Sequence, residues 1–450
     1  MNDQELLDVE NFFSGKSIFI TGGTGYLGKA VIEKILYSCP DVEKVYILLR
    51  DKKGQRAYER ISEIINSSGF QRLRSRKYEI STKLIPVSGN ISEENLGLTK
   101  DVLTVLEKEV SVVFHLAATV NFNEPLSHAM AVNVNGTQEV LKICHRMEKL
   151  KAFVHVSTAF SNSDRRDIEE KIYPHTVKLE EVKLLNKCFP DDEIITKKLI
   201  GNKPNTYTYT KSLAEELVQQ EHGKIPTAIV RPSIVISALE EPAPGWIDNS
   251  NGSTGLFLGM STGVMKVMVG KGTNVTDLIP LDIVVNLIIV AAVNCERSQE
   301  LKVYNCCTGT SNPVTCIGAE EIARRVTTKY SLNKVPFPFM VFTTVYWLYK
   351  FLIFFLQIVP SYIIDIMSII MKKKPIQLKI QHKISKTVDL MKFFLINEWN
   401  FADGNVRSLL NRMTEKDKQT FNFDVKSYTW DKCLEVYVLG IHKYLVKSRK

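Results

Sequence analysis

Tyr207 and Lys211 are the two side chains of this sequence best placed for acid–base chemistry. They lie four residues apart in the run Tyr-Thr-Tyr-Thr-Lys, which is about one helical turn, so we expect both on one face of a helix. A Lys ammonium beside a phenol favours the phenolate, which predicts a lower pKa for Tyr207 than the usual value of about 10. Such a phenol donates and accepts a proton close to neutral pH.

A glycine-rich run near the start of the sequence predicts that a dinucleotide binds. It follows an apolar segment and reads Thr21-Gly22-Gly23-Thr24-Gly25-Tyr26-Leu27-Gly28. Two spacings of a dinucleotide-binding turn fit this run, one that begins at Gly22 and one that begins at Gly23. Glycine permits a tight turn and a close approach of backbone to pyrophosphate, and free N–H groups at the start of the following helix favour the phosphates. The alternative is a purely structural turn between a strand and a helix.

The residues after the second expected strand bear on the choice between NAD and NADP. An NAD enzyme usually places an acid there for the ribose hydroxyls. This sequence instead has Arg50, followed by Asp51-Lys52-Lys53. A guanidinium matches the 2′-phosphate of NADP, so Arg50 and the cations beside it favour NADP. Asp51 is the competing residue, because it would serve NAD one position later.

Small or polar residues follow other expected strands, at the edge where parallel sheets bind ligands. Ser157 and Thr158 close one strand, and Thr158 would donate a hydrogen bond to a substrate carbonyl unless it only satisfies the local backbone. Ala117 and Ala118 follow another strand, and their small side chains would let a cofactor ring or ribose approach. Asn133 would bond the backbone or a water in a proton relay, or else cap a helix.

The alternation of strand-like and helix-like segments predicts an α/β fold with a doubly wound parallel sheet. Short β-rich runs are separated by helical patterns, and the first helix is expected over residues 25–37, before Pro40. This arrangement is typical of an NADP-binding Rossmann domain. The expected strands are residues 17–20, 44–49, 83–87, 112–115, 153–157 and 227–230.

Charge and composition divide the chain unevenly. Residues 1–330 carry 39 Lys and Arg against 40 Asp and Glu, whereas residues 331–450 carry 19 against 9. The positive excess lies beside residues 337–359, which hold one charged and nine aromatic side chains. This favours a membrane surface or an anionic substrate over nucleic acid. We expect a catalytic domain over residues 1–330, an apolar membrane-associated segment over residues 331–371, and a smaller, mainly helical basic domain over residues 372–450.

The cysteines and the N-terminus indicate a reducing compartment. The eight cysteines form no C-x-x-C pair and no metal-ligand spacing, so we expect reduced thiols and no metal site. The first ten residues are acidic and lack an apolar stretch, which predicts no signal peptide. Catalysis is therefore expected in the cytosol or on a membrane facing it.

Taken together, these motifs resemble the fatty acyl-CoA reductases of the extended short-chain dehydrogenase class. The sequence is most similar to the insect members, particularly those of moths. The similarity extends from residue 17 to about residue 445, and its ordered set of motifs is far more specific than any single one. The matching segments are residues 21–28, 47–54, 115–122, 156–160, 207–215, 230–235 and 430–445.

The resemblance implies that a long-chain fatty acyl-CoA is converted to a primary alcohol and CoA by two NADPH, through a thiohemiacetal and an aldehyde. By position it implies that Tyr207 donates a proton, Lys211 assists it and anchors the ribose, and Thr158 orients the carbonyl. The implied catalytic residues are Tyr207, Lys211, Thr158, Ser157 and Asn133. The residues implied to hold NADPH are Thr21, Gly22, Thr24, Gly25, Tyr26, Leu27, Gly28, Arg50, Asn90, Ile91, Ala117, Ala118, Tyr207 and Lys211. Asn90 stands where the family often has an Asp that contacts adenine, which puts the strength of that contact in doubt.

Other functions share part of these features. A sterol dehydrogenase or a sugar-nucleotide epimerase would use the same fold and the same Tyr/Lys pair, although the aromatic C-terminal region disfavours a sugar. A non-catalytic NADPH-binding membrane scaffold is a further alternative. The complete set of Tyr207, Lys211 and Thr158 argues against it.

Residues 337–359 have the length of a membrane-spanning helix, or of a buried helix of the C-terminal domain. A single span before Lys372, Lys373 and Lys374 would place the catalytic domain on the far side from cytosolic NADPH and acyl-CoA. A helical pair that bends at Pro360 and lies in one leaflet removes this conflict. We therefore expect attachment to the cytosolic face of the endoplasmic reticulum membrane, with the peroxisome or lipid droplet as alternatives.

Overall fold

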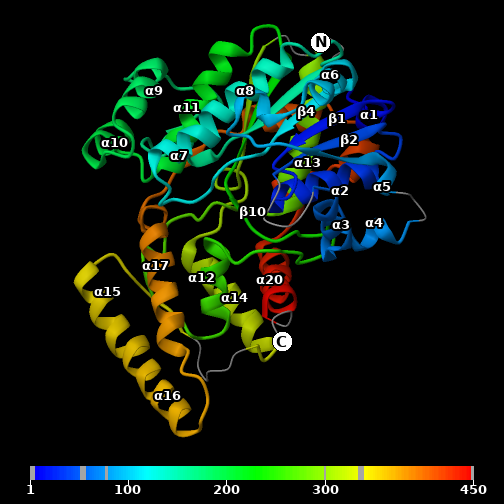
Figure 1. Ribbon diagram of the computed structural model, residues 1–450. Helices are drawn as coiled ribbons and strands as arrows, with labels where there is room; N and C mark the ends of the chain where they lie inside the picture. Colours follow the sequence, from blue (N-terminus) through cyan, green and yellow to red (C-terminus); the bar gives the residue numbers. More distant parts are fainter. Residues whose placement is uncertain (1–5, 51–56, 77–79, 298–299, 333–338, 447–450) are drawn as a thin grey trace.

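A seven-stranded parallel sheet forms the centre of the computed structural model, which describes residues 6–50, 57–76, 80–297, 300–332 and 339–446. The strand order is β11-β7-β5-β4-β1-β2-β3 (Figure 1). The chain order reverses between β1 and β4, where doubly wound sheets bind dinucleotides. The strands are β1 (Ser17–Thr21), β2 (Lys44–Leu49), β3 (Leu84–Ser88), β4 (Val110–His115), β5 (Ala152–Val156), β7 (Thr227–Pro232) and β11 (Lys302–Cys306). The predicted fold class is confirmed, although the sequence reasoning missed the edge strand β11.

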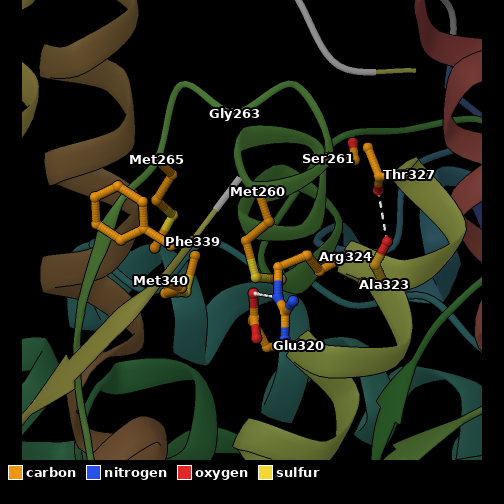
Figure 2. Close-up of a pocket in the computed structure, with 10 residues that line it drawn as sticks. All are labelled: Met260, Ser261, Gly263, Met265, Glu320, Ala323, Arg324, Thr327, Phe339 and Met340. Carbon is orange, nitrogen blue, oxygen red and sulfur yellow. Dashed lines mark hydrogen bonds and ion pairs between the residues drawn. The ribbon is translucent and has the colours of Figure 1, made fainter. Parts of the chain in front are cut away.

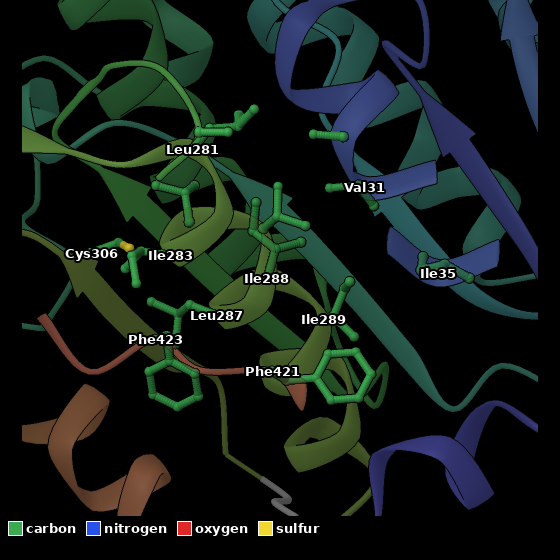
Figure 3. Packing of buried hydrophobic residues seen from close by; sticks show 14 of the residues in the cluster. Val31, Ile35, Leu281, Ile283, Leu287, Ile288, Ile289, Cys306, Phe421 and Phe423 are labelled. Carbon is green, nitrogen blue, oxygen red and sulfur yellow. The ribbon is translucent and has the colours of Figure 1, made fainter. Parts of the chain in front are cut away.

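Helices cover both faces of the sheet, which is why the central strands are buried along their whole length. Every residue of β1, β4, β5 and β7 is buried. On one face, α13 packs against α2, β5 and β7, and its side chains fill the apolar cluster in Figure 3. The other face is covered by α6, α8 and α11. The helices are α2 (Tyr26–Ser38), α6 (Lys100–Glu109), α8 (Gly136–Cys144), α11 (Thr206–Glu221) and α13 (Leu281–Arg297).

The C-terminal portion is mainly helical and packs against this Rossmann fold. β13 (Asn400–Phe401) pairs in parallel with β6 (Asp167–Ile168). Phe421 and Phe423 belong to the apolar cluster that α13 fills (Figure 3). Farther along, α20 (Trp430–Gly440) packs against α14 (Cys316–Lys329) and α12 (Ser253–Ser261). The end of the chain therefore contributes side chains to the same core as the sheet.

One long helix and its return helix project from the body of the molecule (Figure 1). The long helix runs without a break from Tyr346 to Ile370, through α15 (Tyr346–Ile353), a π-helical turn η5 (Phe354–Ile358) and α16 (Val359–Ile370). It is long and apolar enough to cross a membrane by length and composition. The chain then reverses over residues 371–376, and α17 (Gln377–Ile396) packs alongside α16. We call α15, η5 and α16 the outer helix.

The expectation that the helix bends at Pro360 is wrong. Pro360 lies in the first turn of α16, directly after the π-helical turn, and the helix continues through it. Proline has no N–H to donate, and the altered hydrogen-bond pattern of a π turn accommodates that loss. The start of the predicted apolar helix is also wrong, because Val341–Thr343 forms strand β12, which pairs with β9 (Val267–Val269).

Candidate active site

The glycine run forms a turn in which three glycines have no room for a side chain. Gly22 has φ +74°, and a Cβ there would lie 2.6 Å from the Ala117 nitrogen. A Cβ on Gly28 would lie 2.3 Å from the Gly22 oxygen, and one on Gly23 would lie 2.5 Å from Ile47. Gly25 differs, because it is exposed and precedes α2 without a side-chain cap. The first N–H groups of α2 are therefore open to an anion, as a pyrophosphate requires.

A buried hydrogen-bond chain fixes the strand ends on either side of this turn. The Thr21 hydroxyl lies 2.7 Å from His115 Nδ1, and His115 Nε2 lies 2.9 Å from the Thr137 hydroxyl. The Ala117 N–H donates to Thr21 Oγ1 at 3.3 Å. Burial, with a smaller effect of Lys211, lowers the pKa of His115 to about 3, so the ring is neutral and structural. This holds the backbone of Ala117 against Gly22.

The side chains of the remaining residues in the run point away from the open turn. The Tyr26 hydroxyl donates to the carbonyl oxygens of Ile236 and Trp246, both at 3.0 Å. Leu27 packs against the apolar cluster around α13, and Thr24 is half-buried. What Tyr26 and Leu27 present to the site is their backbone N–H groups in the first turn of α2.

Arg50 follows β2, which pairs with β1, and Asn90 and Ile91 follow β3, which pairs with β2. Arg50 has an exposed side chain, and its competitor Asp51 lies outside the described residues. The Asn90 amide donates to Glu93 Oε1 at 2.9 Å, and its oxygen accepts the Ser92 N–H at 3.3 Å. Ile91 is buried against Gly136. Arg50 alone of these has a cationic side chain free to face solvent at the strand end.

The predicted acid–base pair lies on α11, where both side chains reach the end of β5. Lys211 is fully buried, and its Nζ donates to the Val156 carbonyl at 2.7 Å and lies 3.2 Å from His155 Nε2. The Tyr207 and Thr158 side chains come together there, and the interaction with Thr158 acts to lower the pKa of Tyr207, while the Thr158 hydroxyl donates to the Pro232 carbonyl at 3.5 Å. Tyr207 keeps part of its surface exposed, so a substrate can reach it. Tyr207 and Lys211 share one face of α11, as the four-residue spacing predicted. This face lies at the end of β5, so Tyr207 comes close to Thr158.

The pKa shift predicted for Tyr207 has the wrong sign. Burial raises the pKa of Tyr207 to about 12, against a smaller lowering by the hydrogen bond from Thr158. Burial also lowers the pKa of Lys211 to about 8, although Glu215 opposes the shift. Lys211 points at Val156 and His155, so its charge does not offset the desolvation of the phenol. Tyr207 is therefore protonated at neutral pH, which is the form that donates a proton.

Ser157 is directed into a buried ion pair that sequence reasoning missed. Its hydroxyl donates to Glu215 Oε1 at 2.5 Å, and Ser161 donates to the same oxygen at 3.0 Å. Arg231 binds both oxygens of Glu215, at 2.9 and 2.7 Å, and both residues are almost completely buried. Burial raises the pKa of Glu215, but Arg231 and the two serines lower it below its usual value. The spacing of Tyr207, Lys211 and Glu215, each four residues after the last, was the available signal.

Asn133 joins the segment after β4 to α11. Its Oδ1 accepts the Thr119 N–H at 2.9 Å, and its Nδ2 donates to the Thr210 hydroxyl at 2.9 Å. It lies inside the π-helical turn η3 (Ala131–Asn135), so the helix-cap alternative is wrong. Asn133 therefore holds Ala117 and Ala118 in place relative to the helix that carries Tyr207.

A small hollow elsewhere in the molecule holds none of the predicted site residues. Figure 2 shows it between α12 and α14, beside Phe339 and Met340. Three methionines are among the ten residues that line it, and Arg324 Nε lies 3.3 Å from Glu320 Oε1 on one wall. The Ser261 hydroxyl on its wall lies 3.1 Å from His442 Nε2, and the predicted site residues lie instead at the end of the sheet.

Sequence comparisons show which known proteins this chain is similar to. The model of a family described as male sterility protein matches residues 20–288, and a second model with that description matches residues 356–448. Fatty acyl-CoA reductase 1 of Xenopus laevis is 38% identical over 98% of this chain and 87% of its own length. The Homo sapiens protein of that name is 36% identical, and fatty acyl-CoA reductase 2 of Mus musculus is 37% identical. These vertebrate relatives leave the expected likeness to moth members as a prediction.

Solved structures share the fold at low sequence identity. The reductase domain of a nonribosomal peptide synthetase from Mycobacterium tuberculosis superposes with a TM-score of 0.63 at 16% identity, covering 97% of this chain and 95% of its own. UDP-glucuronic acid 4-epimerase from Bacillus cereus, in complex with NAD, gives 0.52 at 14% identity, covering 95% and 99%. The fold alone therefore does not separate a reductase from an epimerase. The full-length similarity to curated relatives does, and the chain belongs to the fatty acyl-CoA reductase family.

Proposed function

We propose that this protein reduces a long-chain fatty acyl-CoA to a primary fatty alcohol and CoA with two NADPH. The observation that carries the proposal is that the Tyr207 and Thr158 side chains come together at the end of β5. This arrangement sets two hydroxyl donors side by side at the edge where this family's cofactor turn opens. Donors fixed in this way stabilise the negative charge that develops on a carbonyl oxygen during reduction.

The residues of this site divide the chemistry as follows. NADPH, when bound, supplies the hydride. Thr158 would position the thioester oxygen, and Tyr207 would give that oxygen its proton, yielding a thiohemiacetal. Collapse of the thiohemiacetal releases CoA as its thiol and leaves an aldehyde. The same two hydroxyls would then serve a second reduction, in which Tyr207 again protonates the oxygen and the alcohol forms.

Lys211 and Ser157 support the two reacting hydroxyls without contacting the substrate carbonyl. The Lys211 ammonium lies among the end of β5, His155 and α11, so it would anchor the cofactor ribose and keep the local potential positive. Ser157 donates to Glu215 rather than facing the substrate. We therefore assign Ser157 a positioning role and leave carbonyl orientation to Thr158.

The residues of the turn fit a dinucleotide, and Arg50 selects NADPH. Gly22 brings backbone against Ala117, and the first N–H groups of α2 are uncapped. Arg50 is exposed at the end of β2, where the 2′-phosphate of NADPH would lie. Arg50→Ala should raise the KM for NADPH about tenfold, the worth of one charge-assisted contact, and leave the KM for NADH nearly unchanged. Equal changes in both values would assign the site to NAD.

The outer helix supports attachment to a membrane surface, because three of its polar side chains face the protein and its exposed side chains are mainly apolar, with Lys350 as the exposed charge. Gln357, Ser361 and Asp365 recur every four residues and are all buried. Gln357 Oε1 accepts the N–H groups of Lys266 and Val267, both at 2.9 Å. The exposed side chains include Trp347, Phe351, Phe354, Phe355, Ile363, Ile366, Met367 and Ile370. A surface of this kind is suited to lipid rather than to water.

The inward contacts favour a helix that lies in the interface over one that spans the bilayer. Spanning would remove Gln357 from its backbone partners, and Asp365 from the N–H groups of Gln377 and Leu378 at the start of α17. Buried polar groups left without partners are costly. Exposed Lys372, Lys373 and Lys374 at the turn before α17 suit anionic headgroups. Both flanks of the helix then remain on the cytosolic face, which we assign to the endoplasmic reticulum rather than the peroxisome or lipid droplet.

A protease test on sealed microsomes examines the attachment. Both the catalytic domain and a tag placed after Lys450 should be digested without detergent. Protection of either one would replace the in-plane helix with a spanning one. Co-fractionation of the tagged protein with peroxisomal or lipid-droplet markers would reassign the organelle without changing the topology.

Product analysis of the purified protein tests the activity itself. With palmitoyl-CoA and NADPH we expect hexadecanol and free CoA, with two NADPH oxidised for each alcohol. Oxidation of a sterol or epimerisation of a UDP-sugar, with acyl-CoA left intact, would establish one of the competing dehydrogenase functions. NADPH binding with no turnover of any of these substrates would establish the scaffold.

A further inference from the structure

Three phenylalanines form a cluster of rings beside Tyr207 and Thr158, and we call them the phenylalanine triad: Phe122, Phe160 and Phe394. Phe122 stacks on the Tyr207 ring, with centroids 5.8 Å apart and planes 25° apart. Phe160 follows Thr158 by two residues, and its N–H donates to Thr158 Oγ1 at 3.3 Å. The two rings meet at Phe394, whose centroid lies 5.6 Å from Phe122 and 5.1 Å from Phe160. An apolar surface therefore begins directly beside the site of proton donation.

The triad comes from three separate parts of the chain, and Phe160 is buried whereas Phe122 and Phe394 are partly exposed. Phe122 follows β4, Phe160 follows β5, and Phe394 is near the end of α17. Phe122 and Phe394 are half-buried, whereas core rings such as Phe114 and Phe153 have no exposed surface. Part of the aromatic surface is thus open to a ligand that approaches Tyr207.

The chemistry of the substrate decides what lies on this surface. A thioester carbonyl held by Tyr207 and Thr158 has a polar CoA on one side and an alkyl chain on the other. The first methylenes of that chain are within a few bonds of the carbonyl carbon, so they must lie close to the residues that surround the hydroxyls. Phenyl rings stabilise methylenes by excluding water and offer nothing to a pyrophosphate or ribose.

The apolar surface continues from the triad toward the outer helix. Phe122 and Phe394 also pack on a second cluster, which contains Val388 and Met391 of α17. The same cluster includes Leu352, Ile353 and Leu356 from the inner side of the outer helix. α17 therefore connects the reacting hydroxyls with the helix whose other side is exposed and apolar. The side chains that line this route in the second cluster are apolar, whereas Lys392 of α17 and Lys350 of the outer helix lie over the Tyr346 ring at its border.

We propose that the phenylalanine triad binds the part of the acyl chain next to the thioester and directs the rest of the chain along α17 toward the membrane. The proposal rests on the acyl-CoA reductase function proposed above. It assigns substrate-binding roles to Phe122, Phe160 and Phe394. It also makes α17 the element that carries specificity for long chains over short ones.

The test compares chain lengths in one variant and a matched control. In Phe394→Ala, kcat/KM for palmitoyl-CoA should fall about tenfold more than kcat/KM for acetyl-CoA, the loss expected when contact with one or two methylenes disappears. Phe393→Ala is the control, because Phe393 is the next residue of α17 and contacts Trp399 and Phe394 rather than Phe122. It should leave the ratio between the two substrates unchanged. If Phe394→Ala lowers kcat/KM by the same factor for both substrates, or does not lower it, the proposal is wrong.

Two further measurements keep the proposal testable if Phe394→Ala is poorly folded or if turnover is absent. Phe394→Leu retains an apolar side chain and should keep most of the preference for palmitoyl-CoA, whereas Phe122→Ala should lose it. Trp399 lies 5.3 Å from Phe160 and 6.0 Å from Phe394, so its fluorescence reports on the triad. Palmitoyl-CoA without NADPH should change that fluorescence saturably, and CoA alone should not. Binding without reduction would contradict the proposed function only, and reduction without this binding would contradict only the triad.

Discussion

Two helices of this protein carry polar side chains at the same four-residue spacing on the side that faces the protein, and the two sets have different roles. On α11 the residues are Tyr207, Lys211 and Glu215, and on the outer helix they are Gln357, Ser361 and Asp365. The rest of α11 is also largely buried, whereas the opposite side of the outer helix is exposed and apolar. On α11, Lys211 and Glu215 are buried at the end of the sheet and their pKa values shift, while Tyr207 stays partly exposed. On the outer helix the polar side chains only hold the helix to the protein.

The comparison shows that spacing alone does not reveal what a polar stripe does. What lies beyond the opposite side of the helix decides the outcome. Where the rest of the helix is buried, as in α11, the polar side chains line a site. Where the opposite side is exposed and apolar, as in the outer helix, that side is available to contact lipid. The strongest tests of this account remove one member of each stripe, or one matched side chain from each environment.

Removing Glu215 should have the largest effect on stability. Glu215→Ala leaves Arg231 buried without its carboxylate, and we expect the free energy of unfolding to fall by about 3–5 kcal/mol. Chemical denaturation monitored by circular dichroism measures this change. Glu216→Ala is the control, since Glu216 is adjacent and accepts instead from Gln220 on the surface. Similar losses in the two variants would show that the ion pair has no special weight.

A pair of Phe→Ala substitutions compares the two environments directly. Phe114 in β4 has no exposed surface, so Phe114→Ala should lower the free energy of unfolding by about 3–5 kcal/mol. Phe354 on the outer helix is 52% exposed, and Phe354→Ala should change it by about 0.5 kcal/mol or less in detergent. The second variant should instead float less with anionic vesicles. A large destabilisation by Phe354→Ala would mean that this side chain packs against protein.

The pH dependence of kcat/KM tests the role of Lys211 on α11. Burial lowers the pKa of Lys211 to about 8, so the ammonium is present below that pH and is lost above it. We expect kcat/KM, which reports the free enzyme, to fall by about tenfold per unit above pH 8. Lys211→Arg keeps its charge at higher pH, so its falling limb should move upward even if its rate is lower. An identical limb in both proteins would assign the titration to another group.

Removing Asp365 should have the smallest effect, confined to one end of α17. Its carboxylate accepts the N–H groups of Gln377 and Leu378 at 2.9 and 3.0 Å, and these hydrogen bonds lower its pKa. Asp365→Ala should speed amide hydrogen exchange in the first turn of α17 and leave exchange in α11 unchanged. If exchange in α17 is unaltered, another contact holds the two helices together.

The sequence predicted those features that depend on local pattern. Six strands, the glycine turn and the shared face of Tyr207 and Lys211 all follow from periodicity and from the stereochemistry of glycine. The strand β11 was missed because it is a short edge strand that contains Lys302 and Asn305, which weaken the apolar pattern.

The errors concern features that depend on the environment of a residue. The pKa of Tyr207 rises because burial outweighs any nearby cation, and burial is not visible in a five-residue motif. Glu215 and Arg231 belong to different elements, and they form an ion pair only because α11 packs beside β7. The outer helix passes Pro360 because a π-helical turn precedes it, and no residue pattern indicated that turn.

The central claim is that Tyr207 donates the proton in a reductase site. The most direct measurement is the rate of hexadecanol formation from palmitoyl-CoA and NADPH by Tyr207→Phe, beside Tyr209→Phe, which removes a buried hydroxyl from the same helix. Tyr207→Phe should lose about a hundredfold to ten-thousandfold of the rate while NADPH still binds, and Tyr209→Phe should stay near the wild-type rate. Near wild-type turnover by Tyr207→Phe would contradict the claim.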